Sequence, residues 1–389
     1  MLKKINIIGA GISGLFLGCC LKKNNFSVTI YEQDRDVSEY GAGINLSKNA
    51  TILLEKTGLL ENLIPLGYKP KRVNFRSFNN GKIINSVLLN KERDDVFLSV
   101  NRKDLIDLLK NTYLNMGGEL IFGKKFNEIN NSTEFFSDDE KKSELFVACD
   151  GIRSEFRQKY FLNDEPKFSN LIAWRGIVSK KNLSSHSLWN EINIHLGSDG
   201  HIVHYPISKG EEINFVAIKK QKKWEKESWI SEGNKIELLS DFNSWNDTVM
   251  ELFSKSYKIH KWGLFERESI KKLVSNNLIL MGDAAHPVLP FLAQGACLAI
   301  EDAYCLSELL SKNDNLNYCL KKYEKLRLKR GKTIQFRSKL QGSFNHLSNG
   351  FLVFFRNLIL KMFAKDIQKS IHKYNVCLLY TSDAADERR

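Results

Sequence analysis

Hydrophobic residues at the start of the chain follow a strand, helix, strand pattern. An apolar run from Ile5 to Ile8 is followed by a glycine-rich turn, a helix-length segment that ends at Lys23, and a second apolar run from Val28 to Tyr31. Short apolar runs bounded by turn residues indicate buried strands, and the segment between them has the length of a helix. The pattern therefore predicts a complete β-α-β unit.

Related patterns return further along the chain. The segment at 99–122 has the spacing of an amphipathic helix, with Leu105, Leu108 and Leu109 on one face, followed by a strand. Two later apolar runs, at 144–149 and 277–281, end in Asp150-Gly151 and Gly282-Asp283. Each run predicts a buried strand that ends in an acidic turn.

The N-terminal glycine turn is the first segment with a chemical signature. Glycines occupy positions 9, 11 and 14, and Ser13 lies among them. Gly9 permits a tight turn, Gly11 lets a pyrophosphate approach the backbone, and Gly14 lets helix and strand pack closely, while the helix N-terminus attracts phosphate charge. Glu32, at the end of the second strand, can accept both hydroxyls of an adenosine ribose. The turn predicts dinucleotide binding and leaves the choice between NAD and FAD open.

Composition and charge narrow the class of protein. The 389 residues are 42% hydrophobic, which is enough for two lobes with separate cores. Seven cysteines show neither a Cys-x-x-Cys pair nor Cys/His ligand spacing, so we expect reduced thiols, no metal and a cytoplasmic location. The formal charge of +13 does not predict nucleic-acid binding, because the lysines are spread along the whole chain.

One apolar stretch comes closest to a membrane span. The segment FLVFFRNLILKMF, residues 351–363, is interrupted by Arg356 and Lys361 and is shorter than the roughly 18 residues that a span needs. At helical spacing it predicts a helix that packs on the protein or faces a partner. The second interpretation is a basic amphipathic surface that makes a weak contact with a membrane.

Three motifs in this order resemble the fingerprints of one enzyme family. They are GxGxxG with Glu32, DGxxS at Asp150 to Ser154, and GDxxHP at Gly282 to Pro287. Together they make the chain similar to the single-component FAD-dependent aromatic monooxygenases over nearly its whole length. The segments at 173–178, 201–207 and 330–360 most resemble the branch of salicylate hydroxylase and 3-hydroxybenzoate 6-hydroxylase.

The resemblance implies an α/β (α+β) fold with a Rossmann-like FAD-binding domain, an antiparallel-sheet substrate domain and a C-terminal helical segment. Residues 1–165 and 268–335 would form the FAD-binding domain, with 71–97 contributing to the substrate side. Residues 166–267 would form the substrate-binding sheet, and 336–376 the C-terminal helices. The sequence has no second GxGxxG unit, so we expect no separate nicotinamide domain. Residues 377–387 read as a translated sequencing-library adapter, so we expect 377–389 to be a non-native tail.

The resemblance also assigns residues to non-covalent FAD. Asp283 would accept the ribityl hydroxyls, and the stiff loop from Pro287 to Pro290 would form a wall beside the flavin ring. Backbone N–H groups at the helix start that follows would face the side where reduced flavin carries negative charge. One departure is Ala293, where many relatives carry glycine. The further candidate cofactor residues are Gly43, Arg102, Asp150, Gly282, Gly295, Ala296 and Cys297.

For catalysis, the resemblance implies that NADH or NADPH reduces the flavin. O2 would then form a flavin C4a-hydroperoxide that hydroxylates an electron-rich aromatic ring, such as a phenolic acid. His201 and Tyr205 lie four residues apart on one strand face, and Gln294 lies on the loop beside the flavin, so these three are the candidate catalytic residues. We expect His201, with an ordinary pKa near 6.5, to remove the phenolic proton. His204, on the other strand face, is the rival base.

Two other functions stay open. The basic apolar helix allows a membrane-associated hydroxylase of a quinone precursor or another lipid-like substrate. A non-catalytic flavin-binding sensor is disfavoured, because every flavin motif and a candidate base are present. The expected partners are a small aromatic molecule and O2, with no nucleic acid, and the chain would be a monomer or a homodimer.

Overall fold

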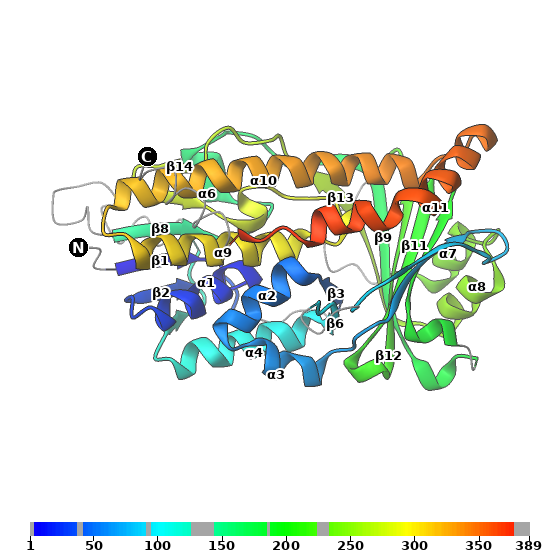
Figure 1. Cartoon of the computed structure of the whole chain (residues 1–389), viewed down its shortest axis with the longest axis horizontal. Helices are drawn as coiled ribbons and strands as arrows, with labels where there is room; N and C mark the ends of the chain where they lie inside the picture. The colour runs from blue at the N-terminus through cyan, green and yellow to red at the C-terminus, as the bar shows by residue number, and fades with distance from the viewer. Residues whose placement is uncertain are drawn as a thin grey trace.

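The computed structural model describes residues 4–36, 42–90, 95–125, 144–184, 187–223 and 233–376. Two large sheets lie at opposite ends of an elongated molecule, and one long helix runs past both (Figure 1). The expected non-native tail at 377–389 lies outside the described residues, so that interpretation stays a prediction.

The first sheet has the strand order β14-β15-β8-β1-β2-β7. Its pairs are parallel except β14 with β15, and the strands of a parallel sheet are apolar because helices cover both faces. The β-α-β unit forms as predicted, with α1 (Ile12–Lys23) between β1 and β2. The strands are β1 (Lys4–Ile8), β2 (Val28–Tyr31), β7 (Glu119–Ile121), β8 (Glu144–Ala148), β14 (Val274–Ser275) and β15 (Leu278–Leu280).

The second sheet has the order β13-β9-β12-β11-β10-β4-β5. Side chains along its strands point alternately to the two faces of the sheet. One face packs on an apolar core, and the other faces the space between the two sheets. We expected a purely antiparallel sheet, but this sheet is mixed, because β10 pairs with β4 in parallel. The strands β4 and β5 come from the segment 71–97, which was expected on the substrate side. The strands are β4 (Arg72–Ser77), β5 (Ile83–Leu88), β9 (Lys167–Ser179), β10 (Ile192–Gly197), β11 (Gly200–Ile207), β12 (Glu212–Lys220) and β13 (Tyr257–Glu266).

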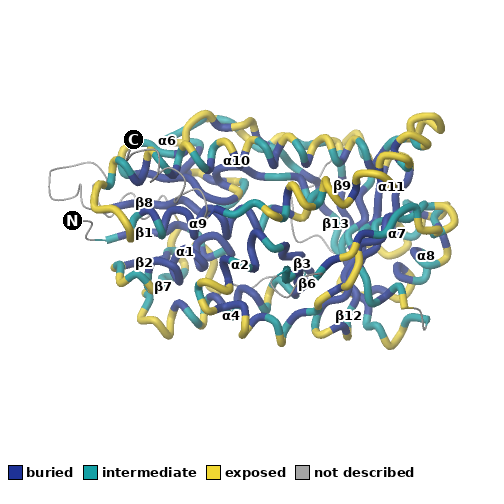
Figure 2. The backbone as a smooth tube through the Cα atoms, viewed as in Figure 1, coloured by how far each residue is buried: buried dark blue, intermediate teal, exposed yellow. Residues whose placement is uncertain are grey.

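Helices cover both sheets and connect them. The helix α9 packs on α1 and on the long α10, and α11 packs on β5 and α2 (Figures 1 and 2). The expected start of the C-terminal segment at residue 336 falls inside α10, so the domain boundaries remain a proposal. The helices are α2 (Lys48–Thr57), α3 (Leu60–Leu63), α4 (Arg102–Asn115), α6 (Glu155–Tyr160), α7 (Lys235–Asp241), α8 (Asp247–Ser254), α9 (Gly295–Lys312), α10 (Leu316–Asn345) and α11 (Gly350–His372).

A two-stranded ribbon of β3 (Gly43–Leu46) and β6 (Leu98–Asn101) touches the second sheet at Gly43. The Gly43 backbone N–H donates a hydrogen bond to Asn214 Oδ1 at 2.8 Å. A Cβ at position 43 would lie 2.8 Å from the Tyr205 ring and from the Asn214 side chain. Only glycine therefore allows this close approach. Among the described helices, none is long and apolar enough to cross a bilayer.

Candidate functional site

One continuous cavity of about 1080 Å³ extends from the first sheet to the second. Glu32 borders one end, Asp283 the middle, and His201 and Tyr205 the other end. The first part lies beyond the carboxyl ends of β1 and β2, where α/β sheets bind their ligands. Candidate residues from distant parts of the sequence thus border one cavity.

The glycine turn presents bare backbone to this cavity. Gly9 has a φ of +100°, and a Cβ there would lie 2.5 Å from the Cys149 carbonyl oxygen. A Cβ on Gly14 would lie 2.0 Å from the Gly9 carbonyl oxygen, so both positions require glycine. A Cβ on Gly11 would meet no heavy atom within 4 Å, because this backbone borders open cavity. Glu32 braces the turn by accepting a hydrogen bond from the Ala10 N–H at 2.7 Å.

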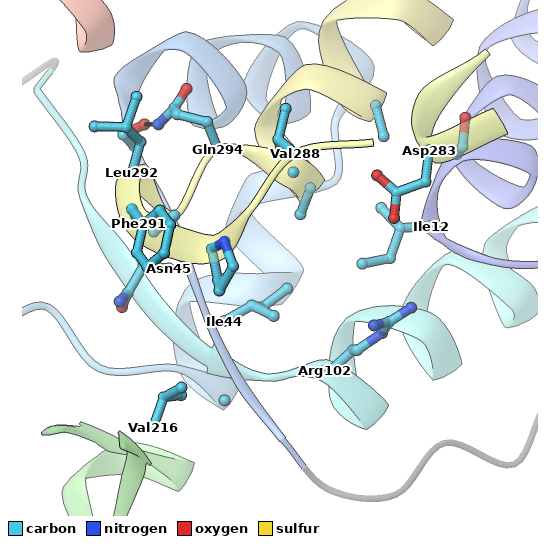
Figure 3. A pocket seen from close by; sticks show the side chains of 18 of the residues that line it. Ile12, Ile44, Asn45, Arg102, Val216, Asp283, Val288, Phe291, Leu292 and Gln294 are labelled. Carbon is cyan, nitrogen blue, oxygen red and sulfur yellow. Dashed lines mark hydrogen bonds between the residues drawn. The ribbon is translucent and has the colours of Figure 1, made fainter. Parts of the chain in front are cut away.

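Asp283 and Arg102 approach the middle of the cavity from different elements (Figure 3). Asp283 follows β15, and Arg102 is the first residue of α4, whose cap Asn101 accepts a hydrogen bond from the Lys103 N–H. The Asp283 carboxyl opens onto the cavity but is otherwise surrounded by protein. Burial raises its pKa, and the charge of Arg102 opposes that rise. A carboxyl in this position is a ready acceptor for ligand hydroxyls.

A buried charge network holds the Gly282-Asp283 turn. Asp302 on α9 accepts hydrogen bonds from the Gly282 N–H at 3.1 Å and from Arg327 Nε at 2.5 Å. Its other contact is with His286 Nε2 at 2.7 Å. Burial alone would raise the pKa of Asp302, but His286 and Arg327 hold it below its ordinary value. The histidine of the GDxxHP motif thus acts as a support for the turn, outside the cavity lining.

The loop from Pro290 to the start of α9 forms one wall of the cavity. Pro290, Gly295 and Ala296 border the space. The first N–H groups of a helix have no acceptor within the helix and carry partial positive charge, so they can face an anionic ligand. The Cys297 side chain is fully buried and lies 3.6 Å from Ser47 Oγ, so its contribution to the site would come from its backbone.

The side-chain amide of Gln294 is less available to a ligand than the sequence suggested. Its Nε2 donates to Ser47 Oγ at 2.9 Å, and its Oε1 accepts from Asn49 Nδ2 at 2.9 Å. Asn49 in turn donates to Glu301 on α9 at 2.7 Å. Gln294 borders the same cavity as His201 and Tyr205, but its amide is hydrogen-bonded to Ser47 and Asn49, which fixes the loop.

His201 and Tyr205 border the far end of the cavity, and His204 does not. His204 faces the opposite side of β11, where its Nε2 lies 3.2 Å from His195 Nε2. His201 Nδ1 instead lies 2.7 Å from Nε2 of His346, which directly follows α10. Burial, with His346 beside it, holds the pKa of His201 well below 6.5. His201 therefore does not have the ordinary pKa near 6.5 that was expected for a base at neutral pH.

Arg175 is a candidate residue that the motifs did not reveal. It lies on β9 and borders the cavity together with Val216, Ile218 and Phe291. Its guanidinium stacks 4.5 Å from the Trp262 ring centroid. The signal in the sequence was a single arginine inside the apolar run IAWRGIV, which has a strand pattern. This arginine gives an otherwise apolar part of the cavity a positive charge.

Asp150 supplies a direct test of whether a large polar ligand fits. Its side chain borders the cavity, and its buried Oδ1 has no hydrogen-bond partner among the described residues. Burial raises its pKa to about 6, against the hydrogen bond from Ser154. An unpartnered buried oxygen is costly unless a ligand donates to it. The unpartnered Oδ1 of Asp150, the bare backbone at Gly11 and the carboxyl of Asp283 together fit FAD.

Comparison with known proteins identifies the family. The profile of the FAD binding domain family matches residues 3–338, and the chain belongs to this family. It is 30% identical over 356 residues to 3-amino-4-hydroxybenzoate 2-monooxygenase PtnB3 of Streptomyces platensis, covering 89% of each chain. It is 26% identical over 352 residues to 3-hydroxybenzoate 6-hydroxylase of Polaromonas naphthalenivorans, covering 87% of each.

A solved structure supports the fold. The substrate complex of salicylate hydroxylase is similar with a TM-score of 0.80 at 22% identity, covering 96% of both chains. The resemblance inferred from the three motifs and the α/β (α+β) fold class are confirmed. The enzyme class, an FAD-dependent monooxygenase, is confirmed as well.

Proposed function

We propose that the protein uses NADH or NADPH and O2 to hydroxylate a phenolic acid at the far end of its cavity. The observation that carries this proposal is the continuity of the cavity from Glu32 and Asp283 to Arg175, His201 and Tyr205. One end suits a dinucleotide and the other suits a small aromatic acid, so both reactants can meet without leaving the protein.

The part of the cavity beside the first sheet would hold FAD. Gly11 and the α1 N-terminus would face the pyrophosphate, Glu32 the adenosine ribose and Asp283 the ribityl chain. Gly43, Arg102, Asp150 and the α9 N-terminus would line the remainder, and Gly282 would serve the turn that presents Asp283. When bound, the flavin supplies electron transfer from NAD(P)H and activation of O2, which no side chain can supply.

The overall reaction balances simply. One oxygen atom of O2 replaces an aromatic hydrogen as a hydroxyl, and the other leaves as water. NAD(P)H and one proton provide the two electrons and two hydrogens that the water requires. The protein's part is to bind the ring in position, to exclude water and to control the phenolic proton.

Arg175 would recognise the acid group of the substrate. It lies in the cavity lining with the apolar side chains Val216, Ile218 and Phe291. The carboxylate of an aromatic acid could therefore pair with the guanidinium while the ring packs on the apolar side chains. The two relatives named above act, by their names, on hydroxybenzoates. Their similarity to this chain supports the same substrate class.

His201 would accept the phenolic hydrogen. That role requires the tautomer in which His201 Nδ1–H donates to His346 Nε2, which leaves His201 Nε2 as the acceptor. With its pKa well below 6.5, His201 stays neutral at rest; it would take the phenolic proton at Nε2 while its Nδ1 proton passes to His346 and from there to solvent, so neither ring keeps the added charge. Burial raises the pKa of Tyr205, so its hydroxyl stays protonated and can orient the ring.

A substrate screen with an Arg175→Gln variant tests this proposal. FAD-loaded protein is given NADH or NADPH with phenolic acids and with the same phenols lacking the carboxyl group. We expect acids to stimulate NAD(P)H oxidation and to yield products one oxygen atom heavier. Arg175→Gln should raise KM for the acids roughly 10- to 100-fold, the usual range for a lost charged hydrogen bond, with little effect on uncharged phenols. An equal effect on both, or no stimulation by any aromatic compound, would contradict the proposal.

A further inference from the structure

The helix α11 exposes an unusual row of large apolar side chains. Phe351, Phe355, Leu358 and Met362 recur at helical spacing along its outer side, and Phe351 and Met362 are 70% and 61% exposed. Exposed positions follow this helix along the edge of the molecule (Figure 2). Contiguous exposed apolar side chains of this size mark an interaction surface.

The opposite side of α11 is firmly attached to the protein. Arg356, Leu360, Ala364 and Ile371 are each less than 5% exposed. The Leu360 carbonyl accepts a hydrogen bond from Asn85 Nδ2 on β5 at 2.5 Å. The apolar row is therefore a fixed surface, already folded, and not the inner face of a helix that lacks its place in the core.

The charge beside the apolar row selects the partner. The same outer line of α11 continues into Lys365, Lys369 and Lys373, and all three are exposed. Asp366 is the only acidic residue of α11. A second copy of this chain would bring another basic row and another net charge of +13 to the interface, so self-association is opposed by repulsion. An anionic lipid surface offers both apolar depth and negative charge.

We infer that the outer face of α11 docks on an anionic membrane surface, with its first three turns in the acyl boundary and its last turns on the headgroups. The protein would lie on the membrane, and none of its described helices would cross it. The surface defined by Phe351, Phe355, Leu358, Met362 and the three lysines is called the α11 face below.

The cavity opens beside α11, along the side of the helix that packs on the protein. Leu340 on α10, with Ile359 and Ile367 on α11, border the cavity and are also exposed. Docking of the α11 face would bring this opening near the lipid surface without covering it. An apolar aromatic compound dissolved in the lipid would then have a short path into the protein.

Vesicle flotation of the full FAD-loaded chain tests the inference. We expect co-flotation with vesicles of phosphatidylcholine and phosphatidylserine in equal parts, weaker flotation with phosphatidylcholine alone, and loss at high salt. The double variant Phe355→Ser/Met362→Ser should lower the partition coefficient at least ~10-fold. Lys365→Glu/Lys369→Glu should lower it on anionic vesicles by a similar factor, since each lysine near the surface contributes roughly fivefold.

Matched controls separate this face from general stickiness. Ile236→Ser removes an apolar side chain that is 78% exposed on α7, and Lys321→Glu/Lys325→Glu reverses two exposed charges at the far end of α10; neither should change flotation. Flavin absorbance reports whether each variant is folded. Equal loss in the control variants, or no flotation by the parent protein, would overturn the inference. So would a stable dimer in sedimentation that Phe355→Ser/Met362→Ser dissociates.

Discussion

His201 owes its chemical character to a histidine that is distant in the sequence. His346 lies 2.7 Å away, and the two rings are 5.0 Å apart between centroids. Neither ring readily becomes charged, because burial lowers the pKa of His346 to about 4 as well. Two neutral, hydrogen-bonded imidazole rings can pass a proton from one to the next, and the role proposed for His201 needs this property.

Replacing His201 with glutamine should uncouple the reaction. His201→Gln keeps the side-chain volume, so FAD binding and most substrate affinity should survive. Product formation should fall by ~10²-fold or more, the usual scale for loss of proton-transfer assistance, while NAD(P)H oxidation continues and hydrogen peroxide appears. Raising the pH toward the pKa of the phenol itself should restore part of the yield, because solvent then supplies phenolate. The measurement is the ratio of product to NAD(P)H consumed.

His204→Gln is the control, since His204 faces away from the cavity. Normal coupling in His201→Gln together with uncoupling in His204→Gln would show that the wrong face was chosen. The parent enzyme adds a second check. Because the pKa of His201 is held well below 6.5, its coupling should not fall as the pH drops from about 8 to about 6.

Ala293 carries backbone strain that a glycine would avoid. Its φ of 52° and ψ of 37° lie in the left-handed region, which costs a non-glycine residue roughly 1–2 kcal/mol. We predict that Ala293→Gly raises the free energy of unfolding by up to about 1 kcal/mol, after the entropy cost of glycine in the unfolded chain. Urea denaturation measures this change. Ala299→Gly, inside α9, should instead lower stability by about 1 kcal/mol; a similar loss at position 293 would refute the strain argument.

The residue scale shows what the sequence could and could not predict. Periodicity placed His201 and Tyr205 on one strand face, because side chains alternate strictly along a strand. It could not predict His346, which lies 145 positions further on, or the pKa that results. Gln294 lies in the loop as predicted, but the sequence did not reveal that Ser47 and Asn49, at the start of α2, hydrogen-bond to its amide.

At the scale of elements, the β1–α1 turn separates two uses of glycine. Gly14 is needed for the turn itself, because a Cβ there would overlap the Gly9 carbonyl. Gly11 borders open cavity, so a methyl group there should disturb only a bound ligand. We predict that Gly11→Ala leaves the unfolding free energy of the FAD-free protein within about 0.5 kcal/mol and weakens FAD binding at least ~10-fold.

Gly14→Ala should lower both stability and FAD binding. Denaturation of the FAD-free protein and flavin titration of both variants distinguish the two cases. Equal destabilisation by the two substitutions would mean that Gly11 serves the turn and not the ligand.

Elements with strong local signals were predicted well. The β-α-β unit follows from apolar runs and their spacing, whereas the sheet at 166–267 was implied by the family resemblance. The parallel pairing of β4 with β10 was missed, because it joins segments 119 residues apart and no local pattern encodes it. The sequence also could not show that α10 passes both sheets, because its hydrophobic pattern changes where its neighbours change.

At the scale of the whole molecule, the two sheets matter through the cavity that they share. The first sheet contributes acceptors and bare backbone, and the second contributes Arg175, His201 and Tyr205. Motifs predicted the cofactor end, because phosphate and ribose recognition demand particular residues at fixed spacing. The substrate end was only outlined, because its shape depends on side chains from both sheets and from α10 and α11.

The most direct measurement follows the oxygen atom. FAD-loaded protein is supplied with NAD(P)H, a phenolic acid that stimulates its oxidation, and dioxygen labelled with a heavy oxygen isotope. The account predicts a hydroxylated product that carries one labelled oxygen atom, and predicts that Asp283→Ala, which should largely lose FAD, forms none. A product without label, or labelled product from flavin-free protein, would contradict the account.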